Sequence, residues 1–64
     1  MARNNDVDFY GELRHKTTMA YLVFDGDNEI WIPKSLVKEL RRIGKGDDYE
    51  FTIPEWLAID KGII

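Results

Sequence analysis

The chain has 64 residues, 9 basic and 12 acidic, one histidine and no cysteine, and its formal net charge is −3. The length fits one domain over residues 1–64, and the absence of cysteine excludes disulfides and thiolate zinc sites. Hydrophobic residues make up 44% and aromatic residues 12%, which favours a folded chain over a disordered one. The longest apolar run, residues 19–24, is too short to cross a bilayer, and we see no signal peptide. We therefore expect a small cytoplasmic protein without membrane contact.

The first half of the chain reads as extended structure. Residues 1–6 are polar and are expected to be frayed. Residues 7–13 alternate weakly and are interrupted by Gly11, which predicts a short edge strand or an ordered arm. Residues 17–24 are rich in Thr, Tyr, Val and Phe with two apolar faces, which predicts a central strand. Residues 25–28 form a turn, and residues 29–32 return as the second strand of a hairpin. Pro33 ends this ladder because it has no N–H to donate.

The second half predicts two helices around one strand. Apolar residues recur at helical spacing over residues 36–43, with Ser35 as the N-cap and Gly44 as the stop. Residues 49–53 alternate as a half-buried strand. Pro54 begins a helix over residues 54–61, in which we expect Trp56, Leu57 and Ile59 to face inward.

The resulting order is (β)-β-β-α-β-α. It predicts an α+β fold with a three- to four-stranded antiparallel sheet and short helices on one face. A small, partly open barrel is the alternative. Either arrangement leaves at least one sheet edge exposed, through which the chain could form a homodimer.

Two motifs resemble a group of short proteins from phages and mobile elements. These motifs are W-I-P-K-S at residues 31–35 and I-P-E-W-L-A-I-D-K-G-I at residues 53–63. The group pattern is W-[IL]-P-K-S followed by [IV]-P-x-W-L-x-x-K-G-[IL], and the resemblance covers residues 20–35 and 52–63. It implies a phage or mobile-element origin and nothing about catalysis, because the group has no established activity.

No constellation of residues indicates an enzyme, a metal site or a cofactor. His15 is the only histidine, and nothing places a nucleophile and a carboxylate beside it. Lys34 and Ser35 are neighbours that point in different directions at a helix start. The acidic turn that begins at Asp25 lacks the bidentate Glu of a calcium loop, since that position is Leu36.

Charge is segregated along the chain. Five of the nine basic residues fall between residues 34 and 45, against one acidic residue, Glu39. They are either the solvated face of the predicted helix or a phosphate-contacting patch. The candidate nucleic-acid-binding residues are Lys34, Lys38, Arg41, Arg42 and Lys45.

Acidic residues gather in two other segments. If the turn at residues 25–28 and the loop before residue 49 lie at the same end of the sheet, six carboxylates converge: Asp25, Asp27, Glu29, Asp47, Asp48 and Glu50. Such a face would hold a basic surface, including the nucleic-acid-binding groove of another protein. Trp31 alternates away from Ile30 and Ile32, so it is either covered by a helix or exposed as an aromatic anchor.

Three functions remain open. The first is a non-enzymatic, phage-type protein that inhibits or adapts a host protein through a charged surface, as anti-CRISPR inhibitors do. The second is an accessory nucleic-acid-binding protein that uses the basic helix. The third is a self-associating structural module.

Overall fold

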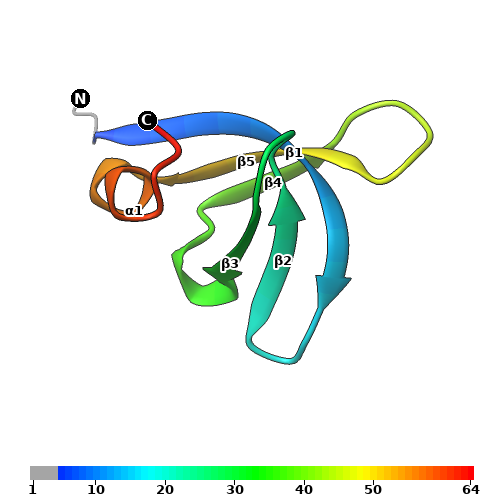
Figure 1. Ribbon diagram of the computed structural model, residues 1–64, viewed down its shortest axis with the longest axis horizontal. Helices are drawn as coiled ribbons and strands as arrows, with labels where there is room; N and C mark the ends of the chain where they lie inside the picture. Colours follow the sequence, from blue (N-terminus) through cyan, green and yellow to red (C-terminus); the bar gives the residue numbers. More distant parts are fainter. Residues whose placement is uncertain (1–4) are drawn as a thin grey trace.

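A computed structural model describes residues 5–64, which form a five-stranded antiparallel sheet and one short helix (Figure 1). The strands are β1 (Asp6–Lys16), β2 (Ala20–Phe24), β3 (Glu29–Pro33), β4 (Glu39–Arg42) and β5 (Asp48–Pro54). A short 3-10 turn, η1 (Lys34–Leu36), follows β3, and helix α1 (Glu55–Asp60) follows β5. The strand order is β3-β2-β1-β5-β4, and the sheet is not closed into a barrel. The predicted antiparallel sheet and C-terminal helix are confirmed, but three to four strands was too few and several helices too many.

Strand β1 is the centre of the sheet, so the prediction of a short edge strand over residues 7–13 is wrong. Its first part pairs with β5 and its last part pairs with β2, and Glu12 belongs to both ladders. The register shifts between Leu13 and His15, which leaves Arg14 as an extra residue. A bulge of this kind bends a strand and increases its twist, and Figure 1 shows β1 curving from one hairpin to the other.

Gly11 allows two strands to approach closely. A Cβ at this position would overlap the side chain of Val23 and would lie 3.2 Å from the carbonyl oxygen of Phe24. Glycine inside a strand often marks such an approach. Gly11 therefore does not interrupt β1, which runs continuously through it. Glycine is required there because a side chain would collide with β2.

Alternation along the strands gives the sheet an inner and an outer face. The inner face holds the core, with the rings of Phe9 and Phe51 stacked at a centroid distance of 5.2 Å. Helix α1 contributes Leu57 and Ala58 to the same core. The other buried core residues are Val23, Ile30, Ile32 and Ile53.

The predicted helix over residues 36–43 does not form. Ser35 and Leu36 lie in η1, Ser35 caps no helix, and residues 39–42 are the edge strand β4. Leu40 pairs with Phe51 and packs against the core. Tertiary pairing with β5 therefore overrides a helical spacing that spans only two turns.

Helix α1 confirms the predicted C-terminal helix but not its orientation. Leu57 faces inward as expected, whereas Trp56 is 59% exposed and Ile59 is 58% exposed. Gly62, at φ 76°, ends the helix, and the Ile63 amide donates to the Ala58 carbonyl at 2.8 Å. A six-residue helix can bury only one narrow face, and here Leu57 and Ala58 occupy it.

The backbone of residues 5 and 6 pairs with the start of α1 and the end of β5. The Glu55 amide donates to the carbonyl oxygen of Asn5 at 2.6 Å, and Asp6 pairs with Pro54. Residues 1–4, the rest of the segment that we expect to be frayed, lie outside the described part of the chain. Within residues 5–64, no helix is long and apolar enough to cross a membrane.

Candidate functional site

The acidic turn and the acidic loop lie at the same end of the sheet. Glu12 on β1 lies opposite Phe24 on one side and opposite Asp48 on the other. The β2–β3 turn begins directly after Phe24, and β5 begins at Asp48. The condition for convergence of the predicted carboxylates is therefore met. We call this group the acidic end; its members are Glu12, Asp25, Asp27, Glu29, Asp47, Asp48 and Glu50.

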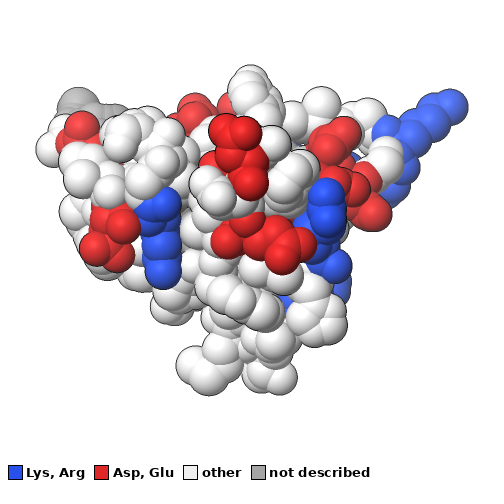
Figure 2. Space-filling model, in the orientation of Figure 1, with Lys and Arg blue, Asp and Glu red and all other residues white. Residues whose placement is uncertain are grey.

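The acidic end occupies the outer face and the adjoining loops. Glu12, Asp48 and Glu50 share the outer face, because paired residues in antiparallel strands lie on one side of the sheet. Tyr10, opposite Glu50, is 66% exposed on this face. A shallow hollow of about 320 Å³ lies between Tyr10, Glu12, Asp48 and the turn at Asp25. Figure 2 shows acidic side chains gathered across one face, with a few basic side chains among them.

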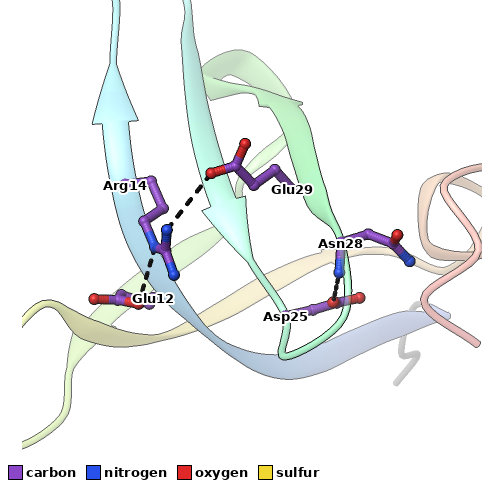
Figure 3. Close-up of polar contacts among 5 residues, drawn as sticks. All are labelled: Glu12, Arg14, Asp25, Asn28 and Glu29. Carbon is purple, nitrogen blue, oxygen red and sulfur yellow. Dashed lines mark hydrogen bonds and ion pairs between the residues drawn. The ribbon is translucent and has the colours of Figure 1, made fainter.

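Arg14 neutralises part of this charge. Its Nε lies 2.9 Å from Oε1 of Glu12, and its Nη1 lies 3.6 Å from Oε2 of Glu29. Its guanidinium carbon also lies 4.3 Å from the centroid of the Phe24 ring. Figure 3 shows the Arg14 side chain reaching toward both carboxylates from the bulge in β1. The ion pairs are solvent-exposed, so each contributes little stability.

The turn holds its first carboxylate in a fixed position. Oδ1 of Asp25 accepts hydrogen bonds from the amides of Asp27 at 2.9 Å and Asn28 at 2.8 Å. The amide of Asn28, followed by that of Asp27, lowers the pKa of the Asp25 carboxyl below its ordinary value. Figure 3 shows the contact with Asn28. Gly26, at φ 109°, supplies the backbone conformation that this turn requires.

Four carboxylates of the acidic end have no cationic partner among residues 5–64. Asp25, Asp27, Asp47 and Asp48 form no ion pair with a described residue. Glu50, in contrast, lies 3.6 Å from Nη2 of Arg41. The acidic loop is anchored to β1, because the Leu13 amide donates to the Asp47 carbonyl at 2.8 Å. The acidic end therefore carries a local excess of negative charge on an ordered framework.

The basic residues between 34 and 45 do not line one face of a helix, because residues 39–42 form a strand. Lys38 lies 3.9 Å from Oδ1 of Asp6, and Arg41 lies 3.4 Å from Glu39. Arg42 donates to the carbonyl oxygens of Lys45 at 2.6 Å and Gly46 at 3.1 Å. Arg41 and Arg42 are consecutive in β4 and so point to opposite faces. Lys45 lies in the loop between β4 and β5, and Figure 2 shows basic side chains on that side of the molecule.

Trp31 is exposed, and within residues 5–64 no helix covers it. It is 45% exposed, and its ring lies 6.4 Å from that of His15 at near-perpendicular orientation. An open groove of about 480 Å³ lies beside it, at the opposite end of β2 and β3 from the turn at Asp25. The groove is lined by Met19, Ala20, Trp31, Pro33, Lys34 and Lys61, among others.

Sequence reasoning missed Glu12 and Arg14, and it did not place Tyr10 beside the acidic segments. The signal was present in the alternation of residues 7–13, where Asp8, Tyr10 and Glu12 share a face. Its meaning depended on β1 being central, which brings Glu12 beside both acidic segments. Within the described residues, no three His, Asp or Glu side chains are placed to hold a metal ion.

Comparison with protein-family models, with curated proteins and with solved structures finds no match.

Proposed function

We propose that this protein is a non-enzymatic binding protein that docks its acidic end onto a basic surface of a partner protein. The observation that carries the proposal is the position of Glu12 between Phe24 and Asp48. It brings together seven carboxylates, of which four have no ion pair with a described residue. Complementary charge of this kind accelerates association and fixes orientation.

The resemblance to phage and mobile-element proteins suggests that the partner belongs to a bacterial host. An inhibitor or adaptor of a nucleic-acid-binding host protein, for example in an anti-defence role, fits an acidic surface. The basic groove of such a protein normally receives phosphates, and ordered carboxylates would compete for it. Exposed Tyr10 supplies an aromatic contact in the middle of the acidic end.

Direct binding to nucleic acid is the weaker alternative. It was based on a basic helix, and residues 39–42 are a strand instead. Lys38, Arg41 and Arg42 are each engaged by a carboxylate or a backbone carbonyl. We therefore expect labelled single- and double-stranded oligonucleotides to show no tight binding at low or physiological salt.

The experiment that tests the proposal compares two variants in affinity capture from a bacterial host lysate. Asp47→Lys/Asp48→Lys reverses charge within the acidic end, while Asp60→Lys/Glu55→Lys makes the same charge change on α1. The proposal expects a captured protein that is lost with the first variant and retained with the second. The purified captured protein must then bind directly, with an affinity that falls as salt rises. Equal capture by wild type and the Asp47→Lys/Asp48→Lys variant would contradict the proposal.

A further inference from the structure

The free edge of β3 presents unpaired backbone groups around Trp31. The Lys34 amide donates to the Met19 carbonyl at 2.8 Å, and the Asp25 amide donates to the Asn28 carbonyl at 3.1 Å. Hydrogen-bonded pairs alternate along an antiparallel ladder, so these two bonds fix the pattern of the whole strand. Residues 30 and 32 therefore bond to β2, whereas the backbone groups of Glu29, Trp31 and Pro33 point away from it. Strand β3 is at the end of the sheet, so among residues 5–64 no strand pairs with these groups.

Opposite charges lie at the two ends of this edge. Asp27 and Glu29 lie at the start of β3, and Lys34 follows directly after its end. Lys61 lines the same groove as Lys34. Neither lysine forms an ion pair with a described residue. The edge is therefore acidic at one end, basic at the other and aromatic in the centre.

An edge with this layout is complementary to itself. When two identical strands pair antiparallel about a two-fold axis, the start of each strand lies beside the end of the other. The acidic start of β3 in one copy would then lie beside the basic end of β3 in the second copy. Glu29 is on the outer face beside Arg14 and Lys34 lies over the Tyr21 ring on the inner face, so the attraction acts between the strand ends and not through direct ion pairs. A parallel arrangement would place like charges side by side.

We infer that two copies of this chain pair through their β3 edges, with Trp31 of each copy opposite Trp31 of the other. This register pairs the full length of both strands. The two Trp31 residues exchange N–H···O=C hydrogen bonds, because the backbone groups of both point outward. Each Glu29 amide donates to the Pro33 carbonyl of the second copy.

Pro33 restricts how this edge can pair. It has no N–H, so the edge offers only its carbonyl at that position. Proline at a sheet edge generally protects against indiscriminate pairing. Here it still accepts the Glu29 amide, so the edge remains compatible with a second copy of itself. The apolar groove formed by Met19, Ala20 and Pro33 lies beside the same edge.

The paired edge uses Asp27 and Glu29 of the acidic end but not its other members. Asp47 and Asp48 lie at the start of β5, on the other side of β1 from β2 and β3. They remain accessible in the paired form. A dimer would therefore present two such acidic loops on one continuous sheet.

Sedimentation equilibrium of charge-reversed variants tests the pairing. Lys34→Glu/Lys61→Glu makes both ends of the edge acidic, and Asp27→Lys/Glu29→Lys makes both ends basic. We expect wild type to dimerise between micromolar and millimolar concentration at low salt, and each double variant to dimerise about tenfold more weakly or worse. An equimolar mixture of the two variants should form a heterodimer, which also shows that both are folded.

The matched control is Asp47→Lys/Asp48→Lys, which reverses two charges away from the β3 edge and should dimerise at least as tightly as wild type. Three results would overturn the inference. One is a wild-type protein that stays monomeric at millimolar concentration. The second is a dimer that both charge-reversed variants preserve, since it would use another surface such as β4. The third is a mixture that associates no better than its components.

Discussion

Glu12 and Asp48 lie directly opposite each other on β1 and β5, with both carboxylates on the outer face. Like charges in this position destabilise a sheet, and Arg14 pairs with Glu12 and Glu29 but not with Asp48. A repulsive pair held on an ordered framework is expected where a surface serves binding rather than stability.

A double-mutant cycle measures this repulsion. Glu12→Gln, Asp48→Asn and the combined variant should show that the wild-type pair is unfavourable by about 0.2–1 kcal/mol in the free energy of unfolding. Urea denaturation provides the values, and added salt should reduce the coupling. The control cycle is Asp8 with Thr52, whose hydroxyl donates to Oδ1 of Asp8 at 2.6 Å; it should give a favourable coupling. A favourable coupling between Glu12 and Asp48 would refute the prediction.

The turn should make stability depend on pH in the acid range. Hydrogen bonds from the amides of Asn28 and Asp27 depress the folded-state pKa of Asp25. A carboxylate with a depressed folded-state pKa stabilises the fold above its unfolded pKa of about 3.9, and this stabilisation is lost as the pH falls through the folded-state value. Asp25→Asn removes the titrating group, so its stability should fall less between about pH 5 and pH 2. Identical profiles for Asp25→Asn and wild type would refute the assignment.

The close approach at Gly11 predicts a large effect from a small substitution. Gly11→Ala places a methyl group against Val23, and overpacking of this kind costs about 1–3 kcal/mol. Gly46→Ala is the matched control, because a Cβ there meets no atom within 4 Å; its effect should be within about 0.5 kcal/mol of zero or stabilising. Thermal or urea unfolding measures both. Equal stability of the two variants would mean that β1 and β2 are not packed as described.

The orientation of α1 predicts a contrast between two of its residues. Leu57 is 3% exposed and Ile59 is 58% exposed. Leu57→Ala should therefore lower the free energy of unfolding by about 2–5 kcal/mol, whereas Ile59→Ala should change it by about 0.5 kcal/mol or less. Chemical denaturation of both variants decides the matter, and a larger loss from Ile59→Ala would show that the helix presents the opposite face.

Elements were predicted correctly from the sequence where the residue pattern fits only one type of secondary structure. The alternation of residues 49–53 and the turn chemistry of residues 25–28 led directly to β5 and to the β2–β3 hairpin. Residues 36–43 permit two readings, since Leu36, Leu40 and Ile43 fit a helix while Glu39, Leu40 and Arg41 fit a strand. Whether these residues form a helix or a strand depends on pairing with β5, whose free edge β4 covers. A short apolar run in the sequence does not indicate such long-range pairing.

The candidate site was predicted only in part, again because long-range strand pairing is not visible in the sequence. The six carboxylates could be named from the sequence, but their convergence depended on the strand order. Glu12 acquired its role only because β1 lies between β2 and β5. For Trp56 the prediction of a core position was wrong. Its size suggested burial, but Leu57 and Ala58 occupy the face of α1 that packs against the sheet.

A chemical-shift titration of the isotope-labelled protein with a short arginine-rich peptide would show whether the acidic end is the binding surface. We expect saturable, salt-sensitive shifts at Glu12, at the 25–29 turn and at Asp47 and Asp48. We expect small shifts at Glu55 and Asp60 on α1, which are acidic but lie outside the acidic end. Shifts of equal size at all acidic residues, or a maximum on α1, would contradict the claim that the acidic end is the binding surface.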